Sequence, residues 1–183
     1  MKIDIFSTDK KYNVIYSDPP WRQTKGGARK VRPNQTRKLD YDTISLEEIK
    51  DYQNQAISIA NDNHVCFLWT IDKYLHAAET IMHELGYRLH ARIIWDKTNG
   101  VAPAFTVRFS HEYLLWFYRG KLLPISKEVR GKFTTVMREK ATRHSQKPIC
   151  AYQMIEALYP EYNKIEMFAR NYRDGWDCWG NEV

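Results

Sequence analysis

The sequence has few cysteines, and their spacing excludes the usual cysteine-built sites. Cys66, Cys150 and Cys178 lie far apart, are odd in number and form no C-x-x-C pair. This arrangement argues against a disulfide framework and against a thiolate zinc site, and it is typical of a reducing compartment. We expect all three thiols to be small buried side chains.

Long apolar runs, metal-ligand spacings and glycine-rich phosphate loops are also lacking. The hydrophobic stretches have the length of a strand, so no membrane span and no signal peptide are predicted. His76, His83 and His90 recur every seven residues, but Gly86 separates the third from the helix predicted for the other two. No G-x-G-x-x-G or P-loop motif occurs. We expect a cytoplasmic protein without a metal site.

The remaining pattern predicts a single α/β domain over residues 1–183. Of these residues 43% are hydrophobic, enough for one core. Strands are predicted at residues 1–6, 12–18, 65–70, 88–95, 112–118, 164–168 and 176–179, and helices at 45–61, 72–86 and 146–158. Ser45 with Glu48 forms a capping box, and Gly86 has the position of a C-cap. This alternation predicts a mostly parallel sheet with helices on both faces.

The positive charge is concentrated in two stretches that have no helix or strand periodicity. Residues 22–40 carry seven Lys or Arg against one Asp, and residues 119–143 carry eight against two Glu, so together they sum to +12 within a net charge of +6. Charge separated in this way suits a polyanion. We expect contacts to nucleic acid from these stretches, by Arg29, Lys30, Arg32 and Lys132. The alternative is that the basic loops only keep the protein in solution.

The most informative motif is Asp18-Pro19-Pro20-Trp21, directly after the apolar run 14–16. An exocyclic amine of a base is a poor nucleophile because its lone pair is delocalised into the ring. A carboxylate and a neighbouring carbonyl can accept both N–H bonds and favour the tetrahedral nitrogen needed for attack on a methyl sulfonium. The prolines remove backbone donors, and Trp21 offers a face for base stacking. The alternative is an ordinary turn with a surface tryptophan.

A series of further segments follows this motif in order. They are residues 41–45 (YDTIS), 67–70 (FLWT), 94–99 (IWDKTN), 144–148 (HSQKP) and 164–171 (KIEMFARN). Together with the tetrapeptide, they resemble the MT-A70 family of adenine methyltransferases over nearly the whole chain. The resemblance implies a Rossmann-like methyltransferase fold in the permuted, β-class order of motifs. It also implies S-adenosylmethionine as methyl donor and the N6 amine of adenine as acceptor.

The resemblance also assigns roles to single residues. Asp18 and Pro19 would hold the amine within the turn that includes Pro20, and Trp21 would line the base site. Tyr41 and Lys147 would lie on two loops that close over the substrate, with the lysine near the donor's carboxylate. The other donor-binding residues would be Asp4, Ile5, Glu166, Phe168, Arg170, Asn171 and Asn181. Ala169 stands where family members often have glycine, so the ribose contacts depart from the family pattern.

The family includes enzymes of eukaryotes that modify RNA and enzymes of bacteria, phages and mobile elements that modify DNA, and the resemblance implies a bacterial or phage protein of the second kind. This chain is compact and lacks zinc fingers, which favours DNA, with the target adenine flipped out of a duplex. An RNA adenine methyltransferase is the alternative, as is a catalytically inactive subunit that only holds nucleic acid. With no separate recognition domain, sequence specificity would come from the loops, a related partner subunit or a homodimer.

Overall fold

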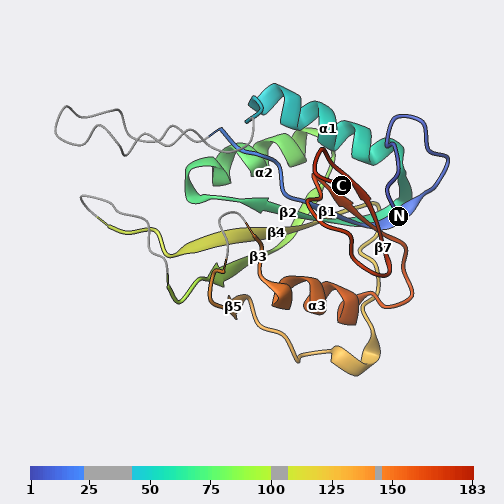
Figure 1. The fold of residues 1–183 in the computed structure, drawn as a ribbon. Coiled ribbons are helices and arrows are strands. Elements are labelled where there is room, and N and C mark those ends of the chain that lie inside the picture. Colours follow the sequence, from blue (N-terminus) through green and yellow to red (C-terminus); the bar gives the residue numbers. More distant parts are fainter. Residues whose placement is uncertain (23–42, 100–106, 143–145) are drawn as a thin grey trace, which may run out of the picture.

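The computed structural model of the protein describes residues 1–22, 43–99, 107–142 and 146–183. Within these ranges seven strands form one sheet in the order β5-β3-β4-β2-β1-β6-β7 (Figure 1). The strands are β1 (Tyr12–Ser17), β2 (Ala60–Thr70), β3 (Arg88–Asp96), β4 (His111–Arg119), β5 (Val136–Arg138), β6 (Lys164–Met167) and β7 (Trp176–Trp179). The helices are α1 (Leu46–Ser58), α2 (Leu75–Glu84) and α3 (Ile149–Leu158), with short 3-10 turns η2 (Asp72–Tyr74) and η3 (Lys127–Val129).

The strand directions confirm the predicted α/β fold with a mostly parallel sheet. β1 pairs in parallel with β2 and β6, as do β6 with β7 and β3 with β5, whereas β4 is antiparallel to both β2 and β3. A parallel neighbour needs a crossover connection, and none of the described residues between β3 and β4 is helical. β4 therefore runs against the other strands and begins at the edge where they end.

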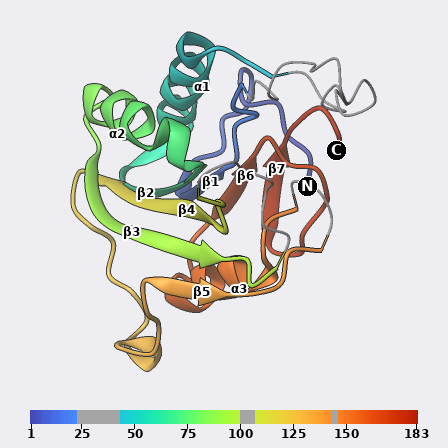
Figure 2. The same ribbon diagram turned by 90° about the vertical axis from the view of Figure 1, so that its left-hand side faces the viewer.

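Helices cover both faces of this sheet. α1 and α2 lie on one face and α3 on the other (Figures 1 and 2). Each face has its own cluster of buried side chains: Ile49 of α1 and Met82 of α2 belong to one cluster, and Met154 and Ile155 of α3 belong to the other. Burial on both faces explains why the central strands are apolar runs rather than alternating patterns.

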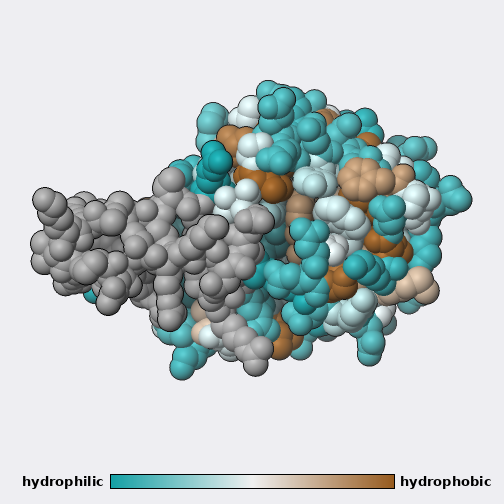
Figure 3. All heavy atoms as spheres, turned by 45° about the horizontal axis from the view of Figure 1, so that its top comes forward, coloured by the Kyte–Doolittle hydropathy of each residue, from teal (hydrophilic) through white to brown (hydrophobic). Residues whose placement is uncertain are grey.

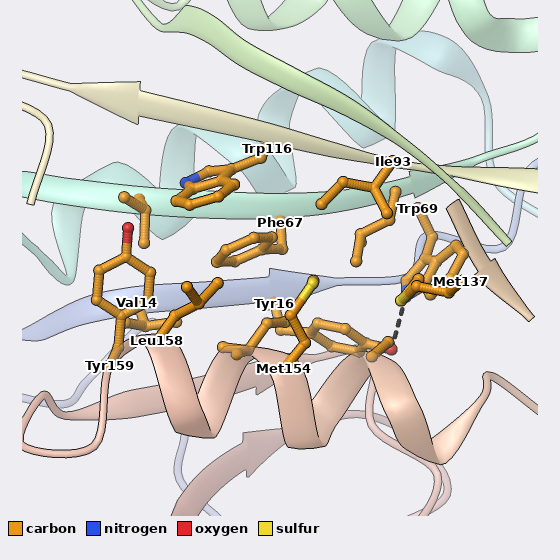
Figure 4. Close-up of a cluster of buried hydrophobic side chains, with 14 of the residues drawn as sticks. Val14, Tyr16, Phe67, Trp69, Ile93, Trp116, Met137, Met154, Leu158 and Tyr159 are labelled. Atoms are coloured by element: carbon orange, nitrogen blue, oxygen red, sulfur yellow. Dashed lines mark hydrogen bonds between the residues drawn. The ribbon is translucent and has the colours of Figure 1, made fainter. Parts of the chain in front are cut away.

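The cluster beneath α3 also supports the end of β1. Tyr16 of β1 and Trp69 of β2 are completely buried, and the indole Nε1 of Trp69 donates a hydrogen bond to the Tyr16 hydroxyl over 2.6 Å (Figure 4). The pair is packed edge to face, with ring centroids 6.4 Å apart. The polar atoms of these aromatic rings thus satisfy each other inside the core, directly below the turn that follows β1.

Two short-range signals in the sequence are confirmed. The Ser45 hydroxyl accepts the Glu48 N–H, and the Glu48 carboxylate accepts the Ser45 N–H, which completes the capping box of α1. Gly86 has φ +81° just after α2, the left-handed conformation that ends a helix and favours glycine.

Other element predictions are wrong. Residues 1–6 are no strand beyond a bridge from Lys2 to Cys178, because the Asp4 carboxylate accepts the Phe6 N–H and the Ser7 hydroxyl and bends the chain. β5 lies inside the basic stretch expected to be a loop. α3 begins only after Pro148, later than predicted. β2 begins earlier than predicted, at Ala60.

The surface is mostly hydrophilic, as the lack of long apolar runs in the sequence predicts. On the face shown in Figure 3, hydrophilic side chains cover most of the coloured surface, and hydrophobic ones are scattered among them. None of the helices in the described ranges is long and apolar enough to cross a membrane. Cys66 and Cys178 are buried and Cys150 is half-buried, each as a free thiol.

The packing of α3 gives a paired test of stability. Ile155 is fully buried against the sheet, whereas Ile149 on the same helix is 52% exposed. We predict that Ile155→Ala lowers the free energy of unfolding by about 2–5 kcal/mol, because it removes a buried side chain and leaves a cavity. Ile149→Ala should change it by less than about 0.5 kcal/mol. Urea denaturation of both variants measures the difference, and equal losses would contradict the burial of this face.

Candidate active site

The turn after β1 is fixed by two backbone hydrogen bonds, one within the turn and one from Ile44. The Trp21 N–H donates to the Pro19 carbonyl over 2.8 Å, and the Ile44 N–H donates to the Pro20 carbonyl over 3.2 Å. A carbonyl oxygen has two lone pairs, so each of these oxygens keeps one acceptor position with respect to the described residues. Asp18, half-buried, precedes the turn at the edge of the sheet where the parallel strands end. Ligands of open α/β sheets bind at this edge.

Trp21 does not offer the open face expected from the sequence. Its side chain is only 4% exposed, and its ring stacks on Tyr74 with centroids 5.3 Å apart. The indole Nε1 donates to the Trp69 carbonyl over 2.8 Å. The expected open stacking face is therefore wrong, because packing beneath α2 and η2 outcompetes exposure for so large a ring. In this structure Trp21 anchors the turn, and its place beside a base stays a prediction.

A charged cluster joins the turn to two other parts of the fold. The Lys147 ammonium lies 2.9 Å from Asp18 Oδ1 and 3.0 Å from Glu112 Oε2. The second oxygen of Glu112 accepts the Lys97 ammonium at 2.6 Å. Asp18 follows β1, Lys97 follows β3, and Lys147 precedes α3. Glu112 is the second residue of the antiparallel strand β4. These four side chains are between 12% and 23% exposed.

Burial and pairing act in opposite directions on these groups. Burial alone would lower the pKa of Lys147, but the carboxylates of Asp18 and Glu112 outweigh it and the net shift is upward. Burial would raise the pKa of Glu112, but the two ammonium groups outweigh it and the net shift is downward. Burial raises the pKa of Asp18, and Lys147 opposes that shift. The cluster therefore keeps Lys147 charged and pointed at Asp18.

Sequence reasoning singled out Asp18 and Lys147, and the structure brings them together. It missed Glu112, although a carboxylate near the start of an otherwise apolar strand was a visible signal. Lys97 belonged to a quoted motif without being given a role. The contact between Lys147 and Glu112 depends on the antiparallel direction of β4, since only that direction places the first residues of β4 at this edge of the sheet.

A second buried carboxylate lies next to the turn. Glu166 of β6 is 8% exposed, and its Oε1 accepts the Tyr152 hydroxyl of α3 over 2.8 Å. Burial raises the pKa of Glu166 to about 7, aided by the charge of Asp18 and opposed by the hydrogen bond from Tyr152. The Tyr152 ring packs on Tyr16, with centroids 4.7 Å apart. Glu166 is thus held at the interface of β6 and α3.

The ends of β6 and β7 form the adjoining edge. Phe168 has φ +61°, a conformation that is unusual for a bulky residue and that often marks a functional site. The Ala169 N–H donates to the Trp179 carbonyl over 2.9 Å. A Cβ on Gly180 would lie 2.3 Å from the Ala169 carbonyl oxygen, so only glycine allows the two strand ends to approach so closely.

Polar groups follow these strand ends on the surface. Arg170 Nε lies 3.5 Å from Glu182 Oε1. Asn171 and Asn181 are exposed. Asp4 lies on the segment whose Lys2 bridges to β7, and its carboxylate accepts hydrogen bonds from its own turn. Ile5 beside it is buried. The predicted donor-binding residues thus share one edge of the sheet, and their role in binding stays a prediction.

Of the residues predicted to contact nucleic acid, the structure describes Lys132. Lys132 is exposed between η3 and β5. The basic stretch that contains it begins where β4 ends, which is the edge of the sheet opposite the charged cluster. Tyr41, Arg29, Lys30 and Arg32 lie outside the described residues. No group of three His, Cys, Asp or Glu side chains suited to a metal ion occurs in the part of the chain that the structure describes.

Comparison with known proteins finds relatives that align with nearly the whole of this chain. A model of the MT-A70 family matches residues 12–182. The chain is 29% identical to the type II methyltransferase M.MunI of Mycoplasma sp, over 95% of this chain and 78% of that protein. It is 27% identical to the N(6)-adenosine-methyltransferase catalytic subunit METTL3 of Homo sapiens, over 94% of this chain but only 28% of that protein. A putative N(6)-adenosine-methyltransferase of Medicago truncatula is 29% identical over 94% of this chain and 26% of its own length.

The environment of Glu166 predicts a pH-dependent stability. Its pKa of about 7 exceeds the usual 4.5, so its contribution to stability is complete below pH 4.5 and is lost as the pH rises through 7. Glu166→Gln cannot ionise, and its free energy of unfolding relative to wild type should therefore increase by about 3 kcal/mol between pH 4.5 and 8. Urea denaturation across this range measures it, with the exposed Glu161→Gln as control. A difference independent of pH would contradict the shift.

Proposed function

Because the chain belongs to the MT-A70 family, we propose that it is an S-adenosylmethionine-dependent methyltransferase that modifies the N6 amine of adenine in DNA. The observation that carries this proposal is the Asp18–Lys147 contact of 2.9 Å at the turn after β1. This contact joins a carboxylate and a fixed positive charge beside the backbone carbonyl of Pro19, at the edge of the sheet where the parallel strands end.

The chemistry of the acceptor explains the need for these groups. The N6 amine must give up its conjugation with the purine before it can attack. Asp18 and the carbonyl of Pro19 together offer acceptors for both N–H bonds, and their fixed positions favour a pyramidal nitrogen with its lone pair directed at the methyl group. The proton leaves readily once the nitrogen is cationic, so the site requires no strong general base.

Lys147 supports this arrangement in two ways. Its ammonium group opposes the effect of burial on Asp18 and so favours the carboxylate that the amine requires. Its position at the edge also suits the carboxylate of an amino-acid moiety. Glu112 and Lys97 lie behind it and fix its direction. Removal of either partner of such a buried pair leaves a charge without compensation.

The residues at the ends of β6 and β7 fit an adenosyl group chemically. Phe168 offers an aromatic face, Arg170, Asn171 and Asn181 offer hydrogen-bonding groups for ribose hydroxyls, and Asp4, Ile5 and Glu166 border the same edge. We assign these residues, with Lys147, to donor binding. When bound, S-adenosylmethionine supplies an activated methyl sulfonium, so the protein contributes positioning and electrostatics.

DNA is the acceptor that the observations favour. The chain spans 78% of the type II methyltransferase of Mycoplasma sp, but about a quarter of the plant and human relatives. We assign to Lys132, which lies at the opposite edge of the sheet, phosphate contacts outside the site. The name of the human relative specifies adenosine, the ribonucleoside, and this makes RNA the second candidate.

The acceptor can be identified directly. The protein is incubated with tritiated S-adenosylmethionine and separate pools of double-stranded DNA, single-stranded DNA and RNA, followed by digestion to nucleosides. We expect label in N6-methyldeoxyadenosine. Label confined to RNA would replace DNA by the second candidate, and absence of label from all pools would contradict the proposed activity.

Asp18→Ala tests the proposed chemistry within the site. Turnover should fall at least about 100-fold, because an interaction with the reacting amine is lost. The donor dissociation constant, measured by calorimetry, should change much less than turnover, since the proposed bonds of Asp18 go to the acceptor and Glu112 still holds Lys147. Asp9→Ala removes an exposed carboxylate before β1 and serves as the control. Turnover of the Asp18 variant near that of wild type would refute the mechanism.

A further inference from the structure

The first turn of α3 is held by a carboxylate from outside the helix. Its N-cap is Pro148, whose side chain makes no capping hydrogen bond. Instead, Glu139 Oε1 accepts the Ile149 N–H and Oε2 accepts the Cys150 N–H, each over 2.8 Å. The first N–H groups of a helix have no partners within it and favour negative charge. Glu139 therefore supplies the cap that Pro148 cannot.

Glu139 is itself fixed to the end of β3. Its N–H donates to the Asp96 carbonyl over 3.3 Å, and its carbonyl accepts the Trp95 indole Nε1 over 2.7 Å. Ala141, two residues after Glu139, is held by the side chain of Asn99. The Ala141 N–H donates to Asn99 Oδ1 over 2.8 Å, and Asn99 Nδ2 donates to the Ala141 carbonyl over 3.1 Å. The position of α3 along the sheet is thus set by the end of β3, through Glu139.

Lys147 lies just before this capped turn. It precedes Ile149 by two residues, so the contact with Glu139 controls where its backbone leaves the helix. The Thr142 hydroxyl also lies 3.0 Å from the Gln146 side-chain oxygen, which joins the chain on both sides of residues 143–145. The ammonium must meet Asp18 and Glu112 together, and a displacement of about 1 Å at a reacting centre can reduce turnover 100-fold.

We propose that Glu139 is a positioning residue that keeps Lys147 against Asp18 by capping α3. Among the described residues, the Glu139 carboxylate accepts the first backbone N–H groups of α3 and also contacts the Cys150 side chain. We therefore infer that it acts on the site through the position of Lys147. This inference deepens the proposed function and rests on it for the kinetic effect, whereas the placement of Lys147 can be measured without any activity.

Kinetics test the catalytic part of the proposal. Glu139→Ala should lower kcat at least about tenfold with a smaller change in the donor KM, because Lys147 is displaced. Glu139→Gln retains one uncharged acceptor and should lose less. Glu47→Gln, which neutralises an exposed carboxylate in the first turn of α1, is the matched control and should keep wild-type kcat. If Glu139 acts through Lys147, then Glu139→Ala combined with Lys147→Met should be no slower than Lys147→Met alone.

Placement is read from the reaction of Lys147 with an amine-reactive reagent, followed by peptide mass spectrometry. Labelling of Lys147 should be at least about fivefold faster in Glu139→Ala than in wild type, with the exposed Lys127 as internal reference and Glu47→Gln unchanged. Equal labelling rates, or additive losses of kcat in the double variant, would overturn the proposal. If wild type transfers no methyl group to any acceptor, the proposed function fails, and labelling still decides whether Glu139 positions Lys147.

Discussion

The site depends on one buried positive charge shared by two carboxylates. Lys147 contacts Asp18 and Glu112 together, at 2.9 and 3.0 Å. A charge removed from water requires such partners, and the loss of any one leaves the others destabilised. The three side chains come from the turn after β1, from β4 and from the segment before α3. The positions of these elements are therefore linked, and the ion cluster acts both as part of the site and as a constraint on the fold.

The reversed direction of β4 meets this constraint. In a sheet whose strands all ran in parallel, the first residues of β4 would lie at the opposite edge, far from Asp18. Since β4 is antiparallel to both neighbours, Glu112 lies across from Trp95 and next to the turn. Lys97 follows β3 and contacts the second oxygen of Glu112. The antiparallel direction of β4 thus places the N-terminal end of this strand, and with it the Glu112 carboxylate, beside the C-terminal ends of the parallel strands.

The sequence predicts what local chemistry determines. Apolar runs predicted six of the seven strands, and the capping box at Ser45 and the glycine at Gly86 predicted helix ends, because each signal lies within a few residues. The ordered motifs indicated Asp18 and Lys147. The direction of β4, the burial of Trp21 against Tyr74 and the capping of α3 by Glu139 could not be predicted, since each depends on contacts between residues distant in the sequence. β5 has only three residues and lies in a charged stretch, so its pattern was too short to detect.

The adjacency of β1 and β6 has a consequence for how the protein is made. β1 spans residues 12–17, yet one of its two neighbours is residues 164–167. During synthesis this side of β1 stays unpaired until residues 164–167 have also left the ribosome, and non-local strand pairing is slow. The turn with Asp18 is thus translated well before β6, and it can gain its final surroundings only after β6 has emerged. A nascent chain cannot hold the finished site, however early its central motif emerges.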